Sequence, residues 1–290
     1  MSKTAKIPVI EQVAELALRL SRRYLAADGA VRSRHDFTQP QLMSCLVLRA
    51  YLKTTYRGVL EVLAVSESLR QRLGLGDKLP HYTTLQKFSA RSQVVAIAQQ
   101  LVNEIGQQAA AQAPAPAEAA MDATGLARTT VSDYYCSRRG RRFRQWVKVS
   151  VMVLCGSLLP LAVVVDLNPT HDCKHARRLL AQAQAGPPPA RLYADSGYDA
   201  EWIHEHCREE WGVESLIQPV VRRTDGTLGG KWRAQMTPEH LKASGYGKRW
   251  AVESFFSGLK RTMGSALQAR RHDQMLAEAS LRVLAYALRR

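Results

Sequence analysis

The sequence predicts an α/β protein in which an all-α N-terminal domain precedes a mixed sheet flanked by helices. Apolar residues recur at three- and four-residue intervals up to about residue 113, whereas the remainder alternates short β-branched runs with helical stretches. A Pro/Ala segment at residues 113–117 separates the two patterns and is too poor in bulky residues to form a core. We therefore expect one domain over residues 1–113 and a second over residues 114–290.

The first domain is predicted to consist of helices at residues 9–25, 39–52, 56–73 and 85–112. Glycines and a proline in residues 74–80 break the pattern, and Tyr82-Thr83-Thr84 then offers a hydroxyl cap for the next helix. A helix, a turn and a capped helix can form a DNA-reading unit, which would present Gln86, Lys87 and Arg91 to a groove. An ordinary helical bundle has the same pattern, so both interpretations stay open.

The second domain is predicted to alternate strands with helices. Strands are expected at residues 119–122, 146–154, 158–167, 192–195 and 215–220, and helices at residues 171–185, 200–211, 249–263 and 274–288. This order, β-β-β-α-β-α-β-α-α, resembles that of a ribonuclease H-like domain. The apolar run at residues 149–165 is valine-rich and is interrupted by Gly156 and Pro160, so it indicates two strands and a turn rather than a membrane span.

The charge of the chain favours a polyanionic partner. The chain contains 41 lysines and arginines and 25 acidic residues, which gives a formal net charge of +16. This excess of positive charge makes nucleic acid the leading partner. Charge alone also fits an unrelated basic enzyme or a ribosome-associated protein. Five cysteines without a CxxC pair suit a reducing cytoplasm, and the first residues lack the apolar segment of a secretory signal. We expect a cytoplasmic protein with no membrane partner.

Two aspartates are predicted to lie at the ends of neighbouring strands. Asp122 closes a short apolar run before Ala-Thr-Gly, and Asp195 stands at the same place in Leu192-Tyr-Ala-Asp-Ser-Gly-Tyr. If the strands are parallel neighbours, about 4.8 Å apart, the two carboxylates meet at one sheet edge. Two carboxylates at such a short distance repel each other unless a cation such as Mg²⁺ neutralises them. Each residue could equally be an ordinary aspartate that begins a turn.

A third carboxylate stands in a more specific pattern near the C-terminus. Tyr246, Arg249, Glu253 and Lys260 lie at offsets of 0, 3, 7 and 14, which places them on one face of a helix. We expect Glu253 to complete the metal shell, with the cations holding phosphates beside the reacting bond. Apolar neighbours are expected to pack against the core, namely Trp250, Val252, Phe255, Phe256 and Leu259. A surface helix with solvated charges is the alternative.

The spacing Tyr-x2-Arg-x3-Glu-x6-Lys resembles the signature of bacterial insertion-sequence transposases of the groups numbered four and five. Met121-Asp-Ala-Thr-Gly is similar to the first-aspartate motif of that family, and Tyr193-Ala-Asp-Ser-Gly-Tyr-Asp-Ala is similar to the second. Leu281-Arg-Val-Leu resembles the terminal helix, and Tyr82-Thr-Thr-Leu also looks family-like. The resemblance covers most of the chain.

The resemblance implies that Asp122, Asp195 and Glu253 form a DDE triad, with Arg249 and Lys260 as DNA contacts. We also expect Tyr246, on the same helix face, to contact DNA. Two Mg²⁺ ions, which Mn²⁺ can replace, would activate a water or a DNA 3′-hydroxyl and stabilise the leaving oxygen. The expected partners are double-stranded DNA, as terminal inverted repeats and target, and a second copy of the chain in a homodimeric DNA complex. The expected location is the bacterial cytoplasm, at the nucleoid.

A basic segment follows the first aspartate. No acidic residue occurs from Tyr134 to Val165, and the segment predicts a loop that tracks phosphates. A solvated basic turn is the alternative. The expected DNA contacts here are Arg138, Arg139, Arg141, Arg142, Arg144 and Lys148.

Histidine and cysteine cluster at residues 171–175 and 204–207, and both residue types can ligate zinc. Neither has an established ligand spacing, so we expect ordinary helix residues there. Two other functions remain open, a non-catalytic DNA-binding derivative of a transposase and a structure-selective nuclease that cuts without joining. The intact triad favours a DNA transposase.

Overall fold

The computed structural model describes residues 7–29, 35–128, 138, 146–168, 170–222 and 224–290. Backbone contacts divide the chain into two compact units. The helical unit holds the described residues up to Leu101, Arg128 and Thr262–Arg290, and the sheet unit holds Val102–Ala127 and the later described residues up to Arg261. The C-terminal segment therefore clusters with the N-terminal helices, and the functional division at residue 113 stays a prediction.

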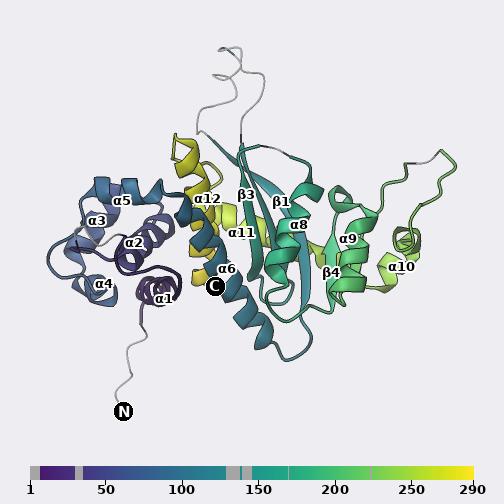
Figure 1. The fold of residues 1–290 in the computed structure, drawn as a ribbon, viewed down its shortest axis with the longest axis horizontal. Coiled ribbons are helices and arrows are strands. Elements are labelled where there is room, and N and C mark those ends of the chain that lie inside the picture. Colours follow the sequence, from purple (N-terminus) through teal and green to yellow (C-terminus); the bar gives the residue numbers. More distant parts are fainter. Residues whose placement is uncertain (1–6, 30–34, 129–137, 139–145, 169, 223) are drawn as a thin grey trace. The chain divides into compact units, whose positions relative to one another are not determined.

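The helical unit is built around a buried C-terminal helix. Nearly every side chain of this helix from Gln274 to Leu288 is buried, which is the pattern of a helix surrounded by others. It contacts both α1 and α2. The helices of this unit are α1 (Val9–Tyr24), α2 (Gln39–Tyr51), α3 (Tyr56–Val65), α4 (Glu67–Arg72), α5 (Tyr82–Ser89), the start of α6 (Ser92–Ala111) and α12 (His272–Arg289) (Figure 1).

Two of the predicted helices were wrong in extent, because each is broken in two. The expected helix at residues 56–73 is interrupted at Ser66, whose side chain accepts from the Leu69 N–H and so caps a new helix. The expected helix at residues 85–112 begins earlier, at Tyr82, and breaks between Ser89 and Ser92. Its cap is also not a hydroxyl: the ring of His81 accepts the Thr83 N–H instead.

The sheet unit contains a five-stranded mixed sheet of order β3-β2-β1-β4-β5. β1 pairs in parallel with β4, and β4 with β5, whereas the β1–β2 and β2–β3 pairs are antiparallel. This mixed sheet flanked by helices confirms the predicted α/β, ribonuclease H-like class. The strands are β1 (Glu118–Ala127), β2 (Trp146–Leu154), β3 (Pro160–Asp166), β4 (Arg191–Ala194) and β5 (Glu214–Ile217).

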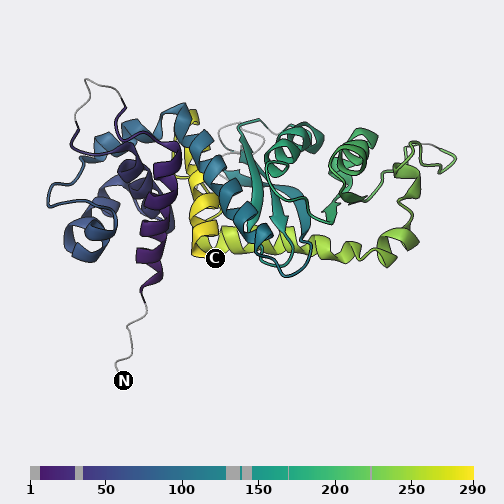
Figure 2. The ribbon, with the colours of Figure 1, turned by 60° about the horizontal axis from the view of Figure 1, so that its bottom comes forward.

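Helices cover both faces of the sheet. α8 (Asp172–Ala183) and α9 (Glu201–Glu205) lie on one face and α11 (Trp250–Met263) lies on the other, as Figures 1 and 2 show. A five-residue π-helical turn continues α9, and α10 spans Pro238–Ala243. α6 crosses β3 at Gly106, where a Cβ atom would lie 2.2 Å from the Pro160 carbonyl oxygen, so only glycine permits this approach.

The apolar run at residues 149–165 forms most of β2 and β3, as predicted. The side chains of both strands are almost entirely buried. Of the helices in the part of the chain that the structure describes, none has the length and apolar character needed to cross a membrane.

His204 of α9 is a fully buried histidine in the sheet unit. Its Nδ1 lies 2.8 Å from the Ser215 hydroxyl oxygen, and its Nε2 has no hydrogen-bond partner among the described residues. Burial, with a smaller effect from the nearby Arg208 cation, lowers the pKa of His204 to about 4. The imidazole is therefore neutral in the folded protein at neutral pH.

This burial predicts a pH-dependent stability. Between pH ~6.5, where an unfolded histidine titrates, and pH ~4, the unfolded chain binds a proton that the folded chain refuses. The stabilising contribution of neutral His204 is complete above this window and is lost as the pH falls through it, by roughly 2–3 kcal/mol. Urea unfolding at pH 7.5 and 4.5 should therefore show a stability advantage over His204→Asn that shrinks at the lower pH.

His272→Asn, at an exposed position, provides the control for the exchange of a histidine for asparagine. In the comparison of wild type with His204→Asn, every other titratable group is present in both proteins and cancels. A constant difference between wild type and His204→Asn would show that His204 does not resist protonation.

Candidate active site

The register of two parallel strands places Asp122 beside Asp195. The last residue pair between β1 and β4 is Met121 with Ala194, and the two aspartates are the next residue on each strand. Parallel neighbours advance in step, so the two carboxylates leave the sheet at the same level. The juxtaposition expected from the sequence is therefore present.

The reason for this position differs from the one predicted. Asp122 was expected to end its strand, but β1 continues to Ala127 because β2 pairs with it antiparallel along the whole length, from Ala119–Leu154 to Ala127–Trp146. Only β4, the parallel partner of β1, stops at this level, at Ala194. Asp122 thus lies in the middle of β1, at the point where β4 ends and leaves the edge open.

The environment of both aspartates raises their pKa. The Asp122 side chain is 20% exposed and its Oδ1 accepts from the Ala123 N–H at 2.6 Å. Burial, together with the charges of Asp195 and Asp172, raises the pKa of Asp122 to about 6. Burial and the charge of Asp172 also raise the pKa of Asp195, whose Oδ1 accepts from the Gly197 N–H at 2.9 Å. Negative charge is crowded here.

Arg249 lies between the first and third predicted carboxylates. Its Nη1 is 3.7 Å from Asp122 Oδ2, and its Nη2 donates to Glu253 Oε1 in a charge-assisted hydrogen bond. The Arg249 charge lowers the pKa of both Asp122 and Asp195. One guanidinium therefore offsets the charge of all three residues predicted to form the triad.

The predicted helix face was wrong at its N-terminal end. Tyr246–Arg249 forms a 3₁₀ turn, and α11 begins only at Trp250, after Gly245 in the left-handed conformation (φ 75°). The hydroxyl of Tyr246 donates to the Ala194 carbonyl at 2.8 Å, directly before Asp195, and burial raises the pKa of Tyr246 to about 12. Tyr246 thus fixes the end of β4, and its role as a DNA contact stays a prediction.

Within α11 the remaining positions follow helical spacing. Glu253 and Lys260 are seven residues apart and share one face, while the opposite stripe of Val252, Phe255, Phe256 and Leu259 is buried as predicted. The expectation for Trp250 was wrong: its side chain is 57% exposed, because it falls on the solvent side of the helix with Glu253 and Ser257. Among the described residues, no carboxylate lies within ion-pair distance of Lys260.

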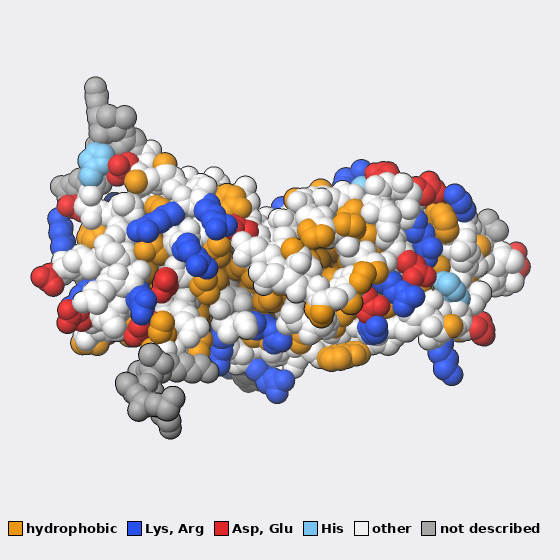
Figure 3. Space-filling view, turned by 90° about the horizontal axis from the view of Figure 1, so that it is seen from below, with side chains coloured by type: hydrophobic (Ala, Val, Ile, Leu, Met, Phe, Trp, Pro, Cys, Tyr) orange, Lys and Arg blue, Asp and Glu red, His pale blue; other side chains and the backbone are white. Residues whose placement is uncertain are grey.

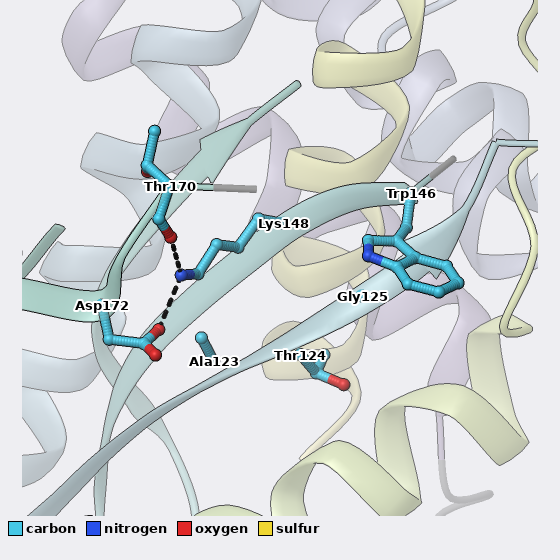
Figure 4. Close-up of a pocket in the computed structure, with 7 residues that line it drawn as sticks. All are labelled: Ala123, Thr124, Gly125, Trp146, Lys148, Thr170 and Asp172. Atoms are coloured by element: carbon cyan, nitrogen blue, oxygen red, sulfur yellow. Dashed lines mark hydrogen bonds and ion pairs between the residues drawn. The ribbon is translucent and has the colours of Figure 1, made fainter. Parts of the chain in front are cut away.

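Sequence reasoning missed Asp172, the fourth acidic residue at this site. Figure 4 shows the ammonium of Lys148 held between the Asp172 carboxylate and the Thr170 carbonyl oxygen, with a Lys148 Nζ–Asp172 Oδ1 distance of 2.7 Å. The Lys148 side chain is only 13% exposed. Lys148, predicted as a DNA contact, is thus engaged by its own chain. The only signal for Asp172 was an acidic residue opening a helix, which is common in proteins.

Asp172 also borders Asp195. A Cβ atom built on Gly197 would lie 2.8 Å from Asp172 Oδ2 and 3.0 Å from Asp195 Oδ1, so the two carboxylates flank this glycine. The Lys148–Asp172 pair lines a cavity of about 230 Å³ together with Trp146. The Trp146 ring lies across Gly125, whose missing side chain makes room for it (Figure 4).

The other predicted contacts are more scattered. Arg139, Arg141, Arg142 and Arg144 lie outside the described residues, and Arg138 is exposed. Lys87 and Arg91, in the helical unit, are exposed as well. In the cluster considered for zinc, the ring of His171 caps α8, and the buried His175 lies 2.8 Å from the Ser150 hydroxyl oxygen.

The donor set at the sheet edge fits a hard divalent cation. Asp122 and Asp195 are oxygen donors whose raised pKa values reflect burial and repulsion from neighbouring carboxylates, and a bound cation relieves both effects. Within the described residues, no three acidic, imidazole or thiol groups are gathered closely enough to hold an ion. Glu253, the predicted third ligand, is paired with Arg249 instead.

Comparison with known proteins gives one finding. A family model described as a transposase DDE domain matches residues 114–288, which include Asp122, Asp195 and Glu253. No curated protein and no solved structure gives a match.

The position of Arg249 predicts a coupled change in two pKa values. Replacing Arg249 by Met removes the cation that favours both carboxylates in their charged form, so the pKa values of Asp122 and Asp195 should both rise. Carbon-detected NMR titration of aspartate-labelled protein measures both. The control is Lys248→Met, since Lys248 binds Glu118 and not the aspartates. Unchanged titration in Arg249→Met would place the guanidinium away from them.

Proposed function

Because the chain belongs to the family of transposase DDE domains, we propose that it is the transposase of a bacterial insertion sequence, of the groups numbered four and five. In this proposal it binds the ends of the element and catalyses metal-dependent strand cleavage and strand transfer. The single observation that carries it is the pairing of Asp122 with Asp195 where β4 ends beside β1. Two half-buried carboxylates at an open sheet edge are suited to hold ions beside a DNA backbone.

Enzymes of this family use divalent metal ions. We assign Asp122, Asp195 and Glu253 as the ligands of two Mg²⁺ ions, which Mn²⁺ can replace. When bound, such ions supply an activated water or 3′-hydroxyl and stabilise the leaving oxygen of an in-line displacement at phosphorus. No side-chain nucleophile is required, so the carboxylates act by binding and orientation.

Arg249 and Glu253 would exchange partners as the complex forms. In the free protein their ion pair holds the Glu253 carboxylate on the guanidinium. If a DNA phosphate takes the place of Glu253 on the guanidinium, the carboxylate is released to complete the metal shell, and Arg249 keeps an anionic partner. Binding of DNA and assembly of the site would then be coupled.

DNA binding is proposed to extend over both units. On the face in Figure 3, lysine and arginine side chains gather over the helical unit, in keeping with the net charge of +16. We place recognition of the terminal repeats in residues 1–113, with the exposed Lys87 and Arg91 as contacts, and the chemistry in residues 114–290. The basic residues 138–144 would track phosphates. Two copies of the chain would join the two element ends in a homodimer, at the nucleoid in the bacterial cytoplasm.

The triad predicts a separation of binding from cleavage. Single Asp122→Asn, Asp195→Asn and Glu253→Gln changes should each lower strand cleavage by a factor of about 10³ or more, because each removes a metal ligand but little volume. Binding of a DNA duplex should stay within a few-fold of wild type. Asp225→Asn is the control, since that exposed carboxylate only holds Thr227.

Strand cleavage by the wild-type protein should require Mg²⁺ or Mn²⁺ and should stop when a chelator is added. A triad variant that still cuts would be removed from the ligand set, and chelator-resistant cutting would exclude the mechanism. Cutting without joining of the cut ends would leave a nuclease, and binding without either reaction would leave a DNA-binding derivative.

Lys260 predicts a change in salt dependence. Lys260 lies seven residues beyond Glu253 on the same face of α11, so Lys260→Ala should lose one phosphate contact and make the log–log salt slope of DNA binding shallower by about one unit. Lys231→Ala is matched to it, because Lys231 in the same unit is already neutralised by Glu209 at 2.8 Å. Fluorescence anisotropy over a salt series measures both slopes. Identical slopes for the two variants would show that the α11 face with Glu253 and Lys260 does not contact DNA through Lys260.

A further inference from the structure

Arg49 is a buried arginine without an acidic partner. It lies in the last turn of α2 and is 7% exposed. Its Nε is buried and has no hydrogen-bond acceptor, and across the described ranges no carboxylate lies within 4.0 Å of its guanidinium. Among the described residues, the interaction found for its charged group is a cation–π contact with Tyr56, whose ring centroid lies 4.2 Å from Arg49 Cζ.

Such a group is costly to bury, because an arginine cannot lose its proton to become neutral. The Tyr56 ring and the negative end of the α2 dipole offset part of the desolvation. Neither accepts a hydrogen bond from Nε. Another arginine of the unit shows the usual solution: Arg72 is paired with Glu11 and Glu15. The position of Arg49 therefore calls for an anion that the folded chain does not supply.

A cavity beside Arg49 has room for that anion. Its volume is about 350 Å³, and it is lined from two segments far apart in the sequence. One wall comes from α2, the start of α3 and α5, and the other from the residues that lead into α12. The lining residues are Arg49, Thr55, Tyr56, Gln86, Gln268, Ala269, Arg270, Arg271 and Gln274.

The first wall is held in place by a tight turn. After α2 the Thr54 N–H bonds to the Arg49 carbonyl and the Lys53 N–H to the Ala50 carbonyl, with Lys53 in the left-handed conformation (φ 54°). This turn brings Tyr56 back over Arg49. The Tyr56 hydroxyl then lies 2.8 Å from that of Ser89, which anchors the ring to α5.

The second wall is held by a buried carboxylate. Glu278 of α12 accepts the N–H groups of Gln268 and Ala269, and it is itself paired with Arg282 at 2.6 Å. Gln274 crosses to the first wall and donates to the Gln86 carbonyl at 3.3 Å. Both walls are thus fixed before any ligand arrives, and Arg270 stands exposed at the rim.

We propose that this cavity binds one phosphate of the DNA backbone, with the Arg49 guanidinium as its buried anchor and Arg270 at its rim. The inference rests on the proposed function, in which the chain binds DNA. A phosphodiester has the oxygens that a planar guanidinium fork recognises. The cavity also opens beside α5, whose exposed Gln86 and Lys87 would lie along the same polyanion. Held there, a phosphate sets the register of DNA on the helical unit without reading sequence.

The test uses the full chain and a fluorescein-labelled DNA duplex of arbitrary sequence. Arg49→Gln should make the log–log salt slope shallower by about one unit, and Arg72→Gln, with a compensated charge, should leave it unchanged. Arg49→Gln should not lower the melting temperature of the free protein, because it removes an uncompensated buried charge. A structural role for Arg49 gives the opposite result, a lower melting temperature with an unchanged slope.

Chemical modification of the DNA gives a second, independent measurement. Neutral methylphosphonate groups are placed one at a time along a duplex of the element's terminal repeat, on which the proposed function gives the protein one register. One position should weaken binding to wild type but not to Arg49→Gln, and Arg270→Gln should reduce the effect at that position. Equal losses for wild type and Arg49→Gln at every position would overturn the proposal. If Arg49→Gln is too unstable to measure, Arg270→Gln takes its place, and equal losses for wild type and Arg270→Gln at every position would overturn it.

Two further outcomes separate this proposal from its premise. If inorganic phosphate stabilises wild type as much as the duplex does, and fails to stabilise Arg49→Gln, the ligand is free phosphate and the DNA assignment falls. If wild type binds no DNA, the proposed function fails and takes this inference with it. If wild type binds DNA with the salt slope of Arg49→Gln, only the phosphate site is lost.

Discussion

The parallel pairing of β1 with β4 is the constraint on which the candidate active site depends. Asp122 and Asp195 are 73 residues apart (195−122) in the sequence, and no local interaction joins them. They meet because parallel strands advance in step and because β4 stops one residue before Asp195 while β1 continues. The antiparallel β2 lets β1 continue, so the rigid centre of the sheet carries Asp122. A site on such an element is held more precisely than one on a loop.

Charge balance is the second theme of the structure. The sheet edge gathers acidic groups whose burial makes the charged form unfavourable, and two cations offset it: Arg249 between Asp122 and Glu253, and Lys148 on Asp172. Both cations were expected to face DNA. The ion pairs mean that protein carboxylates and DNA phosphates compete for the same basic groups, so the net charge of the chain overstates the number of phosphates it can bind.

The helical unit shows the reverse imbalance. Most of its buried polar groups are matched, as in the Glu278–Arg282 pair, which also binds the backbone between α11 and α12. Arg49 is left as a buried cation facing a preformed cavity. The C-terminal helix is central to both features, because it fills the middle of the N-terminal bundle and holds one wall of the cavity.

The sequence by itself determined the α/β class, the order of the strands and helices, and the residues of the proposed triad, because apolar periodicity and motif spacing are local properties. It did not determine where helices break: a hydroxyl at Ser66 outweighs a continuous apolar stripe. Nor could spacing show that Tyr246 begins a 3₁₀ turn against β4, or that Trp250 is exposed.

Only the tertiary structure decided which charges are paired. A sequence does not show whether a charged side chain is solvated, binds DNA or is paired within the chain. The ion-pair partners of Lys148, Asp172, Arg249 and Glu253 lie on other strands and helices or one helical turn away. The placement of α12 within the first unit, and the isolation of Arg49 there, likewise depend on contacts between residues far apart in the chain. Periodicity specifies which face of an element is buried, whereas packing between distant elements specifies which charge each polar group meets.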